Sequence, residues 1–168
     1  MRKENGFTLV ELMIGLAIAA IILTVGIPSF NDLVRKNQMT TQANELIGAL
    51  NLARSEAIKR GSSVSITSTS GDSNWKDGWS VADGGETIRV YAAQKGQHTL
   101  VSDGGDSTYS YDPQGFINNN DTISLCLNSG ATGRRITIAA SGHAHVDGSY
   151  VCPVSYTHLT LPTMSTTC

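Results

Sequence analysis

An apolar stretch near the N-terminus constrains the fold more than any other part of the chain. Residues 7–30, FTLVELMIGLAIAAIILTVGIPSF, contain one formally charged side chain, Glu11. As an α-helix, a stretch of this length would extend about 36 Å, enough to cross a hydrocarbon core about 30 Å thick. The short polar segment MRKENG precedes it, and no small-residue cleavage site of a secretory signal peptide follows it. The sequence therefore predicts a membrane-spanning helix that is retained.

The helix is expected to resume after Gly26 and Pro28, where we predict a kink or a locally loosened turn. Further on, apolar side chains recur at three- and four-residue spacing, which is typical of an amphipathic helix. These residues are Ala43, Leu46, Ile47, Leu50, Ala53, Ala57 and Ile58. The polar residues expected on the other side are Gln42, Glu45, Asn51, Arg54, Ser55 and Lys59. Residues 31–61 should therefore form the second half of one long helix over 7–60, packed against the domain that follows.

The end of this helix carries its own signals. Lys59 and Arg60 suit the negative C-terminal end of the helix dipole, and Gly61 suits the C-cap. Beyond Gly61, residues 62–68 alternate apolar and serine side chains, as a half-buried strand does. Further candidate strands are 79–81, 87–92, 99–102, 108–111, 123–127, 135–139 and 143–146, separated by turns rich in Gly, Asp and Asn. The predicted class is α+β, with a long N-terminal helix packed against an antiparallel β-sheet C-terminal domain over 62–154.

Charge and motif content argue against several functions. Residues 62–168 carry five basic and nine acidic side chains, so this region has a net charge of −4. An acidic domain is a poor general platform for nucleic acid. No G-x-S-x-G, HExxH or phosphate-loop motif is present. We therefore expect no enzyme activity and no cofactor, and we interpret Trp75 and Trp79 as core or loop anchors.

The N-terminus resembles that of type IV pilins and pseudopilins. The features that carry the resemblance are Gly6 followed by Phe7, then Thr8-Leu9, Glu11 inside the apolar stretch, and Pro28 near its end. The resemblance implies that residues 1–6 are a leader and that a prepilin peptidase cleaves after Gly6 on the cytoplasmic side. It also implies that the new amine of Phe7 is methylated and that the helix over 7–30 is kept for assembly.

Glu11 is the unusual residue of this helix. An ionised carboxylate in a membrane helix costs about 3 kcal/mol, somewhat less near the interface. After cleavage, the Phe7 ammonium of an adjacent subunit would compensate for this cost. Our hypothesis is that Glu11 selects the register of each incoming subunit in a helical filament. The alternative is a plain signal-anchor helix that tolerates a glutamate near its end.

Two further segments resemble the minor pilins of the GspH/FimT family. One is NLARSEAIKRG, from Asn51 to Gly61, which a strand follows at once. The other is LCLNSGATGRRITIAASGHAHVDGSYVC, which resembles the closing hairpin of that family. The resemblance implies two β-sheets and a minor type IV pilin that helps prime or cap pilus assembly, with other pilins as partners. The alternatives are a GspH-like minor pseudopilin of a type II secretion system and a minor pilin that binds DNA for uptake.

The resemblance also implies a location. Arg2 and Lys3 favour a cytoplasmic N-terminus, but Arg35 and Lys36 flank the other end of the apolar stretch, so charge alone leaves the orientation open. The peptidase site implies a single-pass inner-membrane protein with a cytoplasmic N-terminus and a periplasmic head, which later enters a pilus or pseudopilus. Disulfides form in that compartment, and Cys126 and Cys152 fit one; the alternative is two unpaired thiols.

The closing hairpin departs from its family in a way that bears on DNA. Relatives that bind DNA use a Gly-Arg-x-Arg motif, whereas this chain has Gly142-His143-Ala144-His145. Only Arg134 and Arg135, on the preceding strand, remain as permanent cations, and affinity for DNA scales with the number of phosphates neutralised. We therefore expect at most a weak DNA site at these four residues, stronger below pH 6. The two histidines have spacing suited to a metal ion, but with no third ligand evident we expect no metal site.

The last residues differ in composition from the rest. Residues 155–168, SYTHLTLPTMSTTC, are rich in Thr, Pro and Leu and resemble translated sequencing-adapter read-through. Our hypothesis is that the native chain departs near residue 154; the alternative is a native disordered tail.

Overall fold

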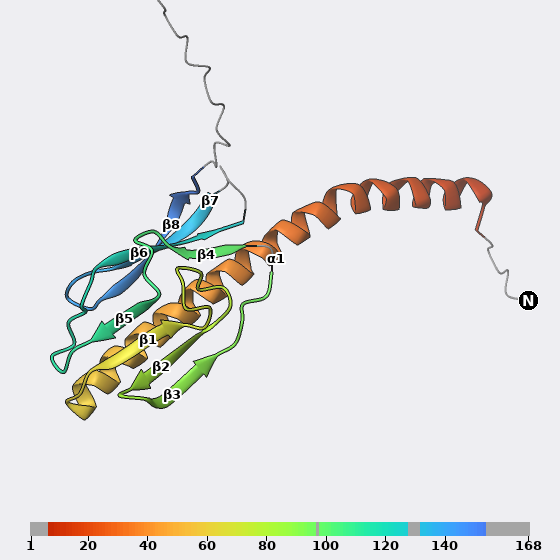
Figure 1. Cartoon of the computed structure of the whole chain (residues 1–168). Helices are drawn as coiled ribbons and strands as arrows, with labels where there is room; N and C mark the ends of the chain where they lie inside the picture. The colour runs from red at the N-terminus through yellow and green to blue at the C-terminus, as the bar shows by residue number, and fades with distance from the viewer. Residues whose placement is uncertain (1–6, 97, 128–131, 154–168) are drawn as a thin grey trace, which may run out of the picture. The chain divides into compact units, whose positions relative to one another are not determined.

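The computed structural model describes residues 7–96, 98–127 and 132–153, and divides the chain into two compact units, 1–38 and 39–168 (Figure 1). The predicted leader, including Gly6, and the predicted tail over 155–168 lie outside the described residues. Helix α1, Leu9–Arg60, contributes to both units. Its backbone is helical without interruption through residues 26–28, and the kink expected there stays a prediction.

The head consists of the second half of α1 and eight strands in two antiparallel sheets (Figure 1). One sheet has the order β3-β2-β1-β5 and the other the order β4-β6-β7-β8. The strands are β1 (Val64–Ser68), β2 (Trp79–Asp83), β3 (Glu86–Tyr91), β4 (Thr99–Ser102), β5 (Thr108–Tyr111), β6 (Asp121–Cys126), β7 (Thr132–Ile138) and β8 (Ala144–Val151). The predicted α+β class is therefore confirmed, and each predicted strand is present, β4 and β5 with the predicted ends and the others with shifted ends.

Strand β8 differs most from its prediction, because it continues through Asp147-Gly148, a pair typical of turns. Along β7, Gly133 and Arg135 are two residues apart, but their partners on β8, Tyr150 and Asp147, are three apart. This extra residue is a β-bulge, which lets the strand keep pairing past the glycine.

The core of the head forms around small side chains of α1. Ala43, Leu46, Leu50, Ala53 and Ala57 are fully buried, as the amphipathic pattern predicted, and Ala49 joins them. They share one apolar cluster with residues from both sheets. The helix stripe and the inner faces of both sheets therefore form one core.

Two residues of the predicted pattern lie elsewhere. Ile58 was expected in the core but is 51% exposed, because it lies beside the loop that contains Gly115 rather than under a sheet. Gln42 was expected on the polar side but is buried, because the loop between β3 and β4 covers it. Its Nε2 donates a hydrogen bond of 2.7 Å to the carbonyl of Lys95, whereas its buried Oε1 has no hydrogen-bond partner among the described residues, so the cost of burying the amide is offset only in part.

Aromatic residues fill the head between the sheets. Trp75 stacks on Tyr109 with ring centroids 5.1 Å apart, and Trp79 stacks on Tyr91 at 5.4 Å. Both tryptophans are fully buried, which confirms their interpretation as core anchors. The Tyr109 hydroxyl donates to the carboxylate of Asp121, so β5 of one sheet is joined to β6 of the other. Burial and this hydrogen bond raise the pKa of Tyr109, which keeps the hydroxyl a donor.

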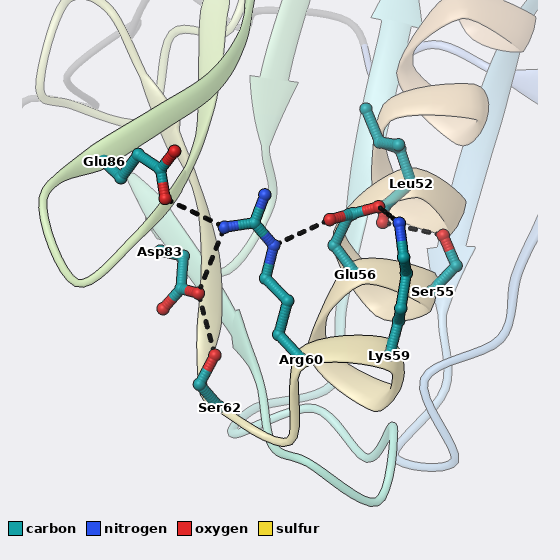
Figure 2. Close-up of polar contacts among 8 residues, drawn as sticks. All are labelled: Leu52, Ser55, Glu56, Lys59, Arg60, Ser62, Asp83 and Glu86. Carbon is teal, nitrogen blue, oxygen red and sulfur yellow. Dashed lines mark hydrogen bonds and ion pairs between the residues drawn. The ribbon is translucent and has the colours of Figure 1, made fainter.

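The C-terminal end of α1 is attached to the β2–β3 hairpin by an ion cluster (Figure 2). Arg60 Nε lies 2.7 Å from Glu56 Oε2, and its Nη1 lies 3.0 Å from Glu86 Oε2 and 3.5 Å from Asp83 Oδ2. The hydrogen bond from Arg60 lowers the pKa of Glu56. Gly61 ends the helix with φ +65° and donates to the carbonyl of Ala57, as the predicted C-cap requires.

Arg54 joins the helix to two loops of the head. Its Nε donates 3.0 Å to the carbonyl of Gly115, and the Tyr111 hydroxyl beside it donates 3.3 Å to the carbonyl of Gly142. Burial raises the pKa of Tyr111 to about 12, so this hydroxyl stays protonated. Gly142 has φ +79°, and a Cβ there would meet Tyr111 Cε1 at 3.0 Å, Arg54 Nε at 3.1 Å and, closer still, the carbonyl of Gly115.

This packing predicts that Gly142→Ala destabilises the head more than Gly71→Ala. Both glycines have a positive φ, +79° and +73°, but a Cβ at Gly71 meets nothing within 4 Å. Gly71→Ala, the matched control, should lower the free energy of unfolding by about 1–2 kcal/mol, because alanine must adopt a left-handed backbone conformation there. Gly142→Ala should cost about 2 kcal/mol more, because its methyl group overpacks the site. Urea unfolding of the detergent-solubilised chain measures both, and equal costs would contradict the close packing.

The predicted disulfide is present and closes one end of the second sheet. Cys126, at the end of β6, is bonded to Cys152, which follows β8, across a sequence separation of 26 residues. Gly133 of β7 lies against the bridge, and a Cβ there would be 3.2 Å from Cys126 Sγ and closer to Cys152 Sγ. The disulfide therefore links β6 and β8, the two strands that flank β7 in this sheet.

Removing the bridge by Cys126→Ser with Cys152→Ser should lower the free energy of unfolding. The loss expected from loop entropy is about 3.5 kcal/mol, because the unfolded chain regains the freedom of the closed loop. Urea unfolding of the same solubilised chain measures it, and reduction of the unmodified protein with dithiothreitol should give a matching loss. An unchanged urea midpoint in both cases would show that the bridge does not stabilise the head.

Candidate functional site

The N-terminal unit presents an apolar surface with no cover from the described part of its own unit. Leu9, Ile21 and Phe30 are 74%, 66% and 65% exposed, and Phe7 just before the helix is 86% exposed. An 18-residue window of α1 has a mean hydropathy of 2.5 and is not buried at all, so the helix is long and apolar enough to cross a membrane. Such a surface requires lipid or other apolar helices around it.

Glu11 and Thr8 together cap the start of α1. Thr8 N and Thr8 Oγ1 donate to Glu11 Oε2 at 3.2 and 3.1 Å, and the backbone N–H of Glu11 donates to Thr8 Oγ1 at 3.3 Å. This reciprocal pair is a capping box, in which a Thr and the Glu three residues later satisfy free N–H groups of the first turn. The sequence analysis missed this role, although the spacing T-x-x-E before an apolar run is its signal. Glu11 therefore has a local partner as well as the one expected on a neighbouring subunit.

The four residues of the predicted DNA site do not form one surface. On β7, Arg134 pairs with Leu125 and Arg135 pairs with Ser124 of β6. Since neighbouring residues of a strand point to opposite faces, the sheet separates the two arginines. His145 pairs with Thr137 and shares the face of Arg135, whereas His143 lies in the turn before β8.

Arg135 is engaged within the head. Its Nη2 lies 3.2 Å from Asp103 Oδ2, and its guanidinium carbon lies 4.0 Å from the centroid of the Tyr150 ring. Asp147, opposite Arg135 on β8, accepts hydrogen bonds from the backbone and hydroxyl of Ser149, which lower its pKa. The permanent charge that a phosphate would need is therefore already paired with the carboxylate of Asp103.

No group of three or more metal-ligating side chains occurs in the part of the chain that the structure describes. The candidate site with the clearest chemical character is therefore the apolar surface that the described side chains of residues 7–30 present, together with the Thr8–Glu11 cap.

Comparisons with known proteins give matches for both the N-terminal segment and the head. The family model described as "Type II transport protein GspH" matches residues 42–142, and the prokaryotic N-terminal methylation motif matches residues 1–27. A "Fimbrial protein" of Pseudomonas aeruginosa is 32% identical over 115 residues, which cover 66% of this chain and 74% of that relative. The type IV major alpha-pilin of Moraxella bovis is 41% identical over 46 residues, 27% of this chain and 29% of that relative.

A solved structure has the same fold. The crystal structure of the type IV minor pilin FimU of Pseudomonas aeruginosa superposes with a TM-score of 0.62 at 22% identity, covering 70% of this chain and 93% of that one. The family model spans more than half of the chain, and the fimbrial relative exceeds 30% identity over most of its length. This chain therefore belongs to the family of type IV minor pilins and GspH proteins.

Proposed function

We propose that this protein is a structural subunit of a type IV pilus, present in few copies at or near the tip, where it helps prime or cap assembly. The observation that carries the proposal is the exposed apolar stretch of helix over residues 7–30, in a chain whose head has a core of its own. In this proposal the apolar half anchors the precursor in the inner membrane and later packs among the helices of other pilins. The head stays on the periplasmic side and is displayed on the fibre.

The alternative machine is a type II secretion pseudopilus, which would use the same helix and head. The matching family model carries the name of a type II transport protein. In contrast, two relatives that align with this chain over 74% of their length are named fimbrial proteins. This second observation favours the pilus. Deleting the gene and scoring both surface pili and protein secretion separates the two machines.

DNA binding receives no support from the geometry. Arg135 is paired with Asp103, Arg134 lies on the other face of the sheet, and the head carries a net charge of −4 over residues 62–168. We therefore retain DNA binding only as the weak, acid-dependent interaction expected from the sequence and build no function on it.

Processing of the N-terminus provides a direct test. The methylation motif over residues 1–27 supports cleavage by a prepilin peptidase between Gly6 and Phe7. Mass spectrometry of the mature protein should give an N-terminus at a methylated Phe7. A peptidase-deficient strain is the control, and there the leader should remain attached. A chain that keeps Met1 in the presence of the peptidase would contradict the proposal.

Glu11 has two candidate roles in assembly, and two substitutions separate them. Glu11→Val removes both the charge and the cap, whereas Glu11→Gln removes the charge but can still cap, since Gln also serves in capping boxes. If the carboxylate pairs with the Phe7 amine of a neighbouring subunit, both variants should insert normally and lose incorporation into fibres by about tenfold or more, because a charged pair in an apolar setting is lost.

The measurement is the amount of the variant in sheared fibres relative to the amount in the membrane. Normal incorporation of Glu11→Gln with loss of Glu11→Val would assign Glu11 to helix capping alone. Normal incorporation of both variants would remove Glu11 from the assembly mechanism.

A further inference from the structure

A groove of about 480 Å³ lies in the head between α1 and β3. Its helix side is lined by Glu45, Gly48, Asn51, Leu52 and Ser55, and its sheet side by Arg89 and Tyr91. The groove is open along the helix because Gly48 has no side chain, and a Cβ built there would meet nothing within 4 Å. Between Glu45 and Ser55 the helix rises about 15 Å, which sets the length of the groove.

Two polar bridges hold β3 along the helix and mark the ends of the groove. At one end, Gln94 Nε2 donates 2.9 Å to Glu45 Oε2. At the other end, Arg60 joins Glu56 on the helix to Glu86 at the start of β3, and Figure 2 shows the guanidinium between the two carboxylates. The groove between these bridges is therefore a built feature of the fold.

One wall of the groove is a free sheet edge. Strand β3 is the last in the order β3-β2-β1-β5, so its outer backbone groups pair with no strand in the described part of the head. Four of its six residues are exposed, among them Val90 at 66%. A free edge beside a groove is the arrangement to which an extended peptide adds as a further strand, with alternate side chains entering the groove.

The charge in the groove indicates what the peptide carries. Arg89 lies with its guanidinium carbon 4.8 Å from the centroid of the Tyr91 ring, and no ion pair is found for it among the described residues. The carboxylate of Glu45 already accepts a hydrogen bond from Gln94. Glu45 keeps its negative charge at the Gln94 end of the groove, so the lining as a whole is neutral. Arg89 on β3 is the one cation among the lining residues, and it is the group that a carboxylate would bind.

We propose that this groove binds an extended acidic segment of a neighbouring pilin subunit, which adds to the free edge of β3. About five residues in extended conformation cover the 15 Å of the groove. The backbone of the segment pairs with β3, a carboxylate binds Arg89, and a small or apolar side chain covers Gly48 and Leu52. This inference rests on the proposed pilus function and names the surface through which the head recognises its neighbour.

Photo-crosslinking in the assembled fibre tests the proposal. A photoreactive amino acid replaces Val90 on the free edge of β3, and a matched control replaces Val151 on β8, the edge strand of the other sheet; the two valines are 66% and 65% exposed. Position 90 should crosslink to a non-helical, acid-containing segment of another pilin, identified by mass spectrometry. Position 151 should give at most a fifth of that yield.

A second substitution tests the charge. Arg89→Glu, combined with the photoreactive residue at position 90, should lower the crosslink yield at least fivefold, whereas Arg89→Lys should retain most of it. Gly48→Trp should lower the yield as well, because a large side chain at this lining position would occupy the groove, and a Cβ there meets nothing within 4 Å. Equal amounts of mature chain in the membrane show that the variants fold.

The failures are distinguishable. If the unmodified chain is absent from sheared fibres, the proposed function and this inference both fall. If the chain is in the fibres but position 90 gives no more crosslinks than position 151, or gives crosslinks insensitive to Arg89→Glu, the groove inference alone is overturned. Crosslinks from position 90 to a helical segment of the neighbour would also overturn it, since they would indicate helix docking instead.

Discussion

The structure depends on the burial of one stripe of α1 against both sheets. The stripe is built largely from alanine, and Ala43, Ala49, Ala53 and Ala57 are all fully buried. These alanines share one continuous core with residues of both sheets. Without this contact each sheet would expose an apolar face, because the helix is the layer that covers it.

The same helix has the opposite property over residues 7–30. There, large apolar side chains such as Ile22 at 64% exposure have no cover from the described residues of their unit. Composition accounts for the difference, since the stretch over 7–30 is apolar on every side whereas the later turns are apolar on one side only. A helix that is hydrophobic all round requires lipid or other helices, and a helix with one apolar stripe requires a single partner layer. The chain therefore encodes two environments within one element.

Much of this was predictable from the sequence, because strand and helix periodicities depend only on neighbouring residues. The strand 99–102 and the strand 108–111 have the predicted ends, and the cap at Gly61 follows from local backbone rules. The errors concern residues whose environment is set by distant parts of the chain. Gln42 is buried because of a loop about fifty residues later, and the separation of Arg134 from Arg135 by the sheet follows from the pairing of β7 with β6. The groove beside Gly48 likewise has no local signal in the sequence. Its sheet side is held along the helix by the ion pair of Arg60 with Glu86 and by the hydrogen bond of Gln94 to Glu45.

The composition of the helix also decides where recognition between subunits takes place. Apolar side chains over residues 7–30 pack against lipid about as well as against other pilins, so they give little preference among neighbours. Glu11 is the one formal charge in that stretch, and in the register hypothesis a single carboxylate would select the register along the helix rather than the identity of the neighbour. Discrimination among subunits therefore requires the head, where charges and free backbone groups are fixed by packing. The two longest edge strands, β3 and β8, both carry a β-bulge, and β8 is in addition flanked by the disulfide, which restrains it. Strand β3 is the edge whose inner face opens onto a groove with a free arginine, so it is the edge that combines backbone pairing with side-chain selection.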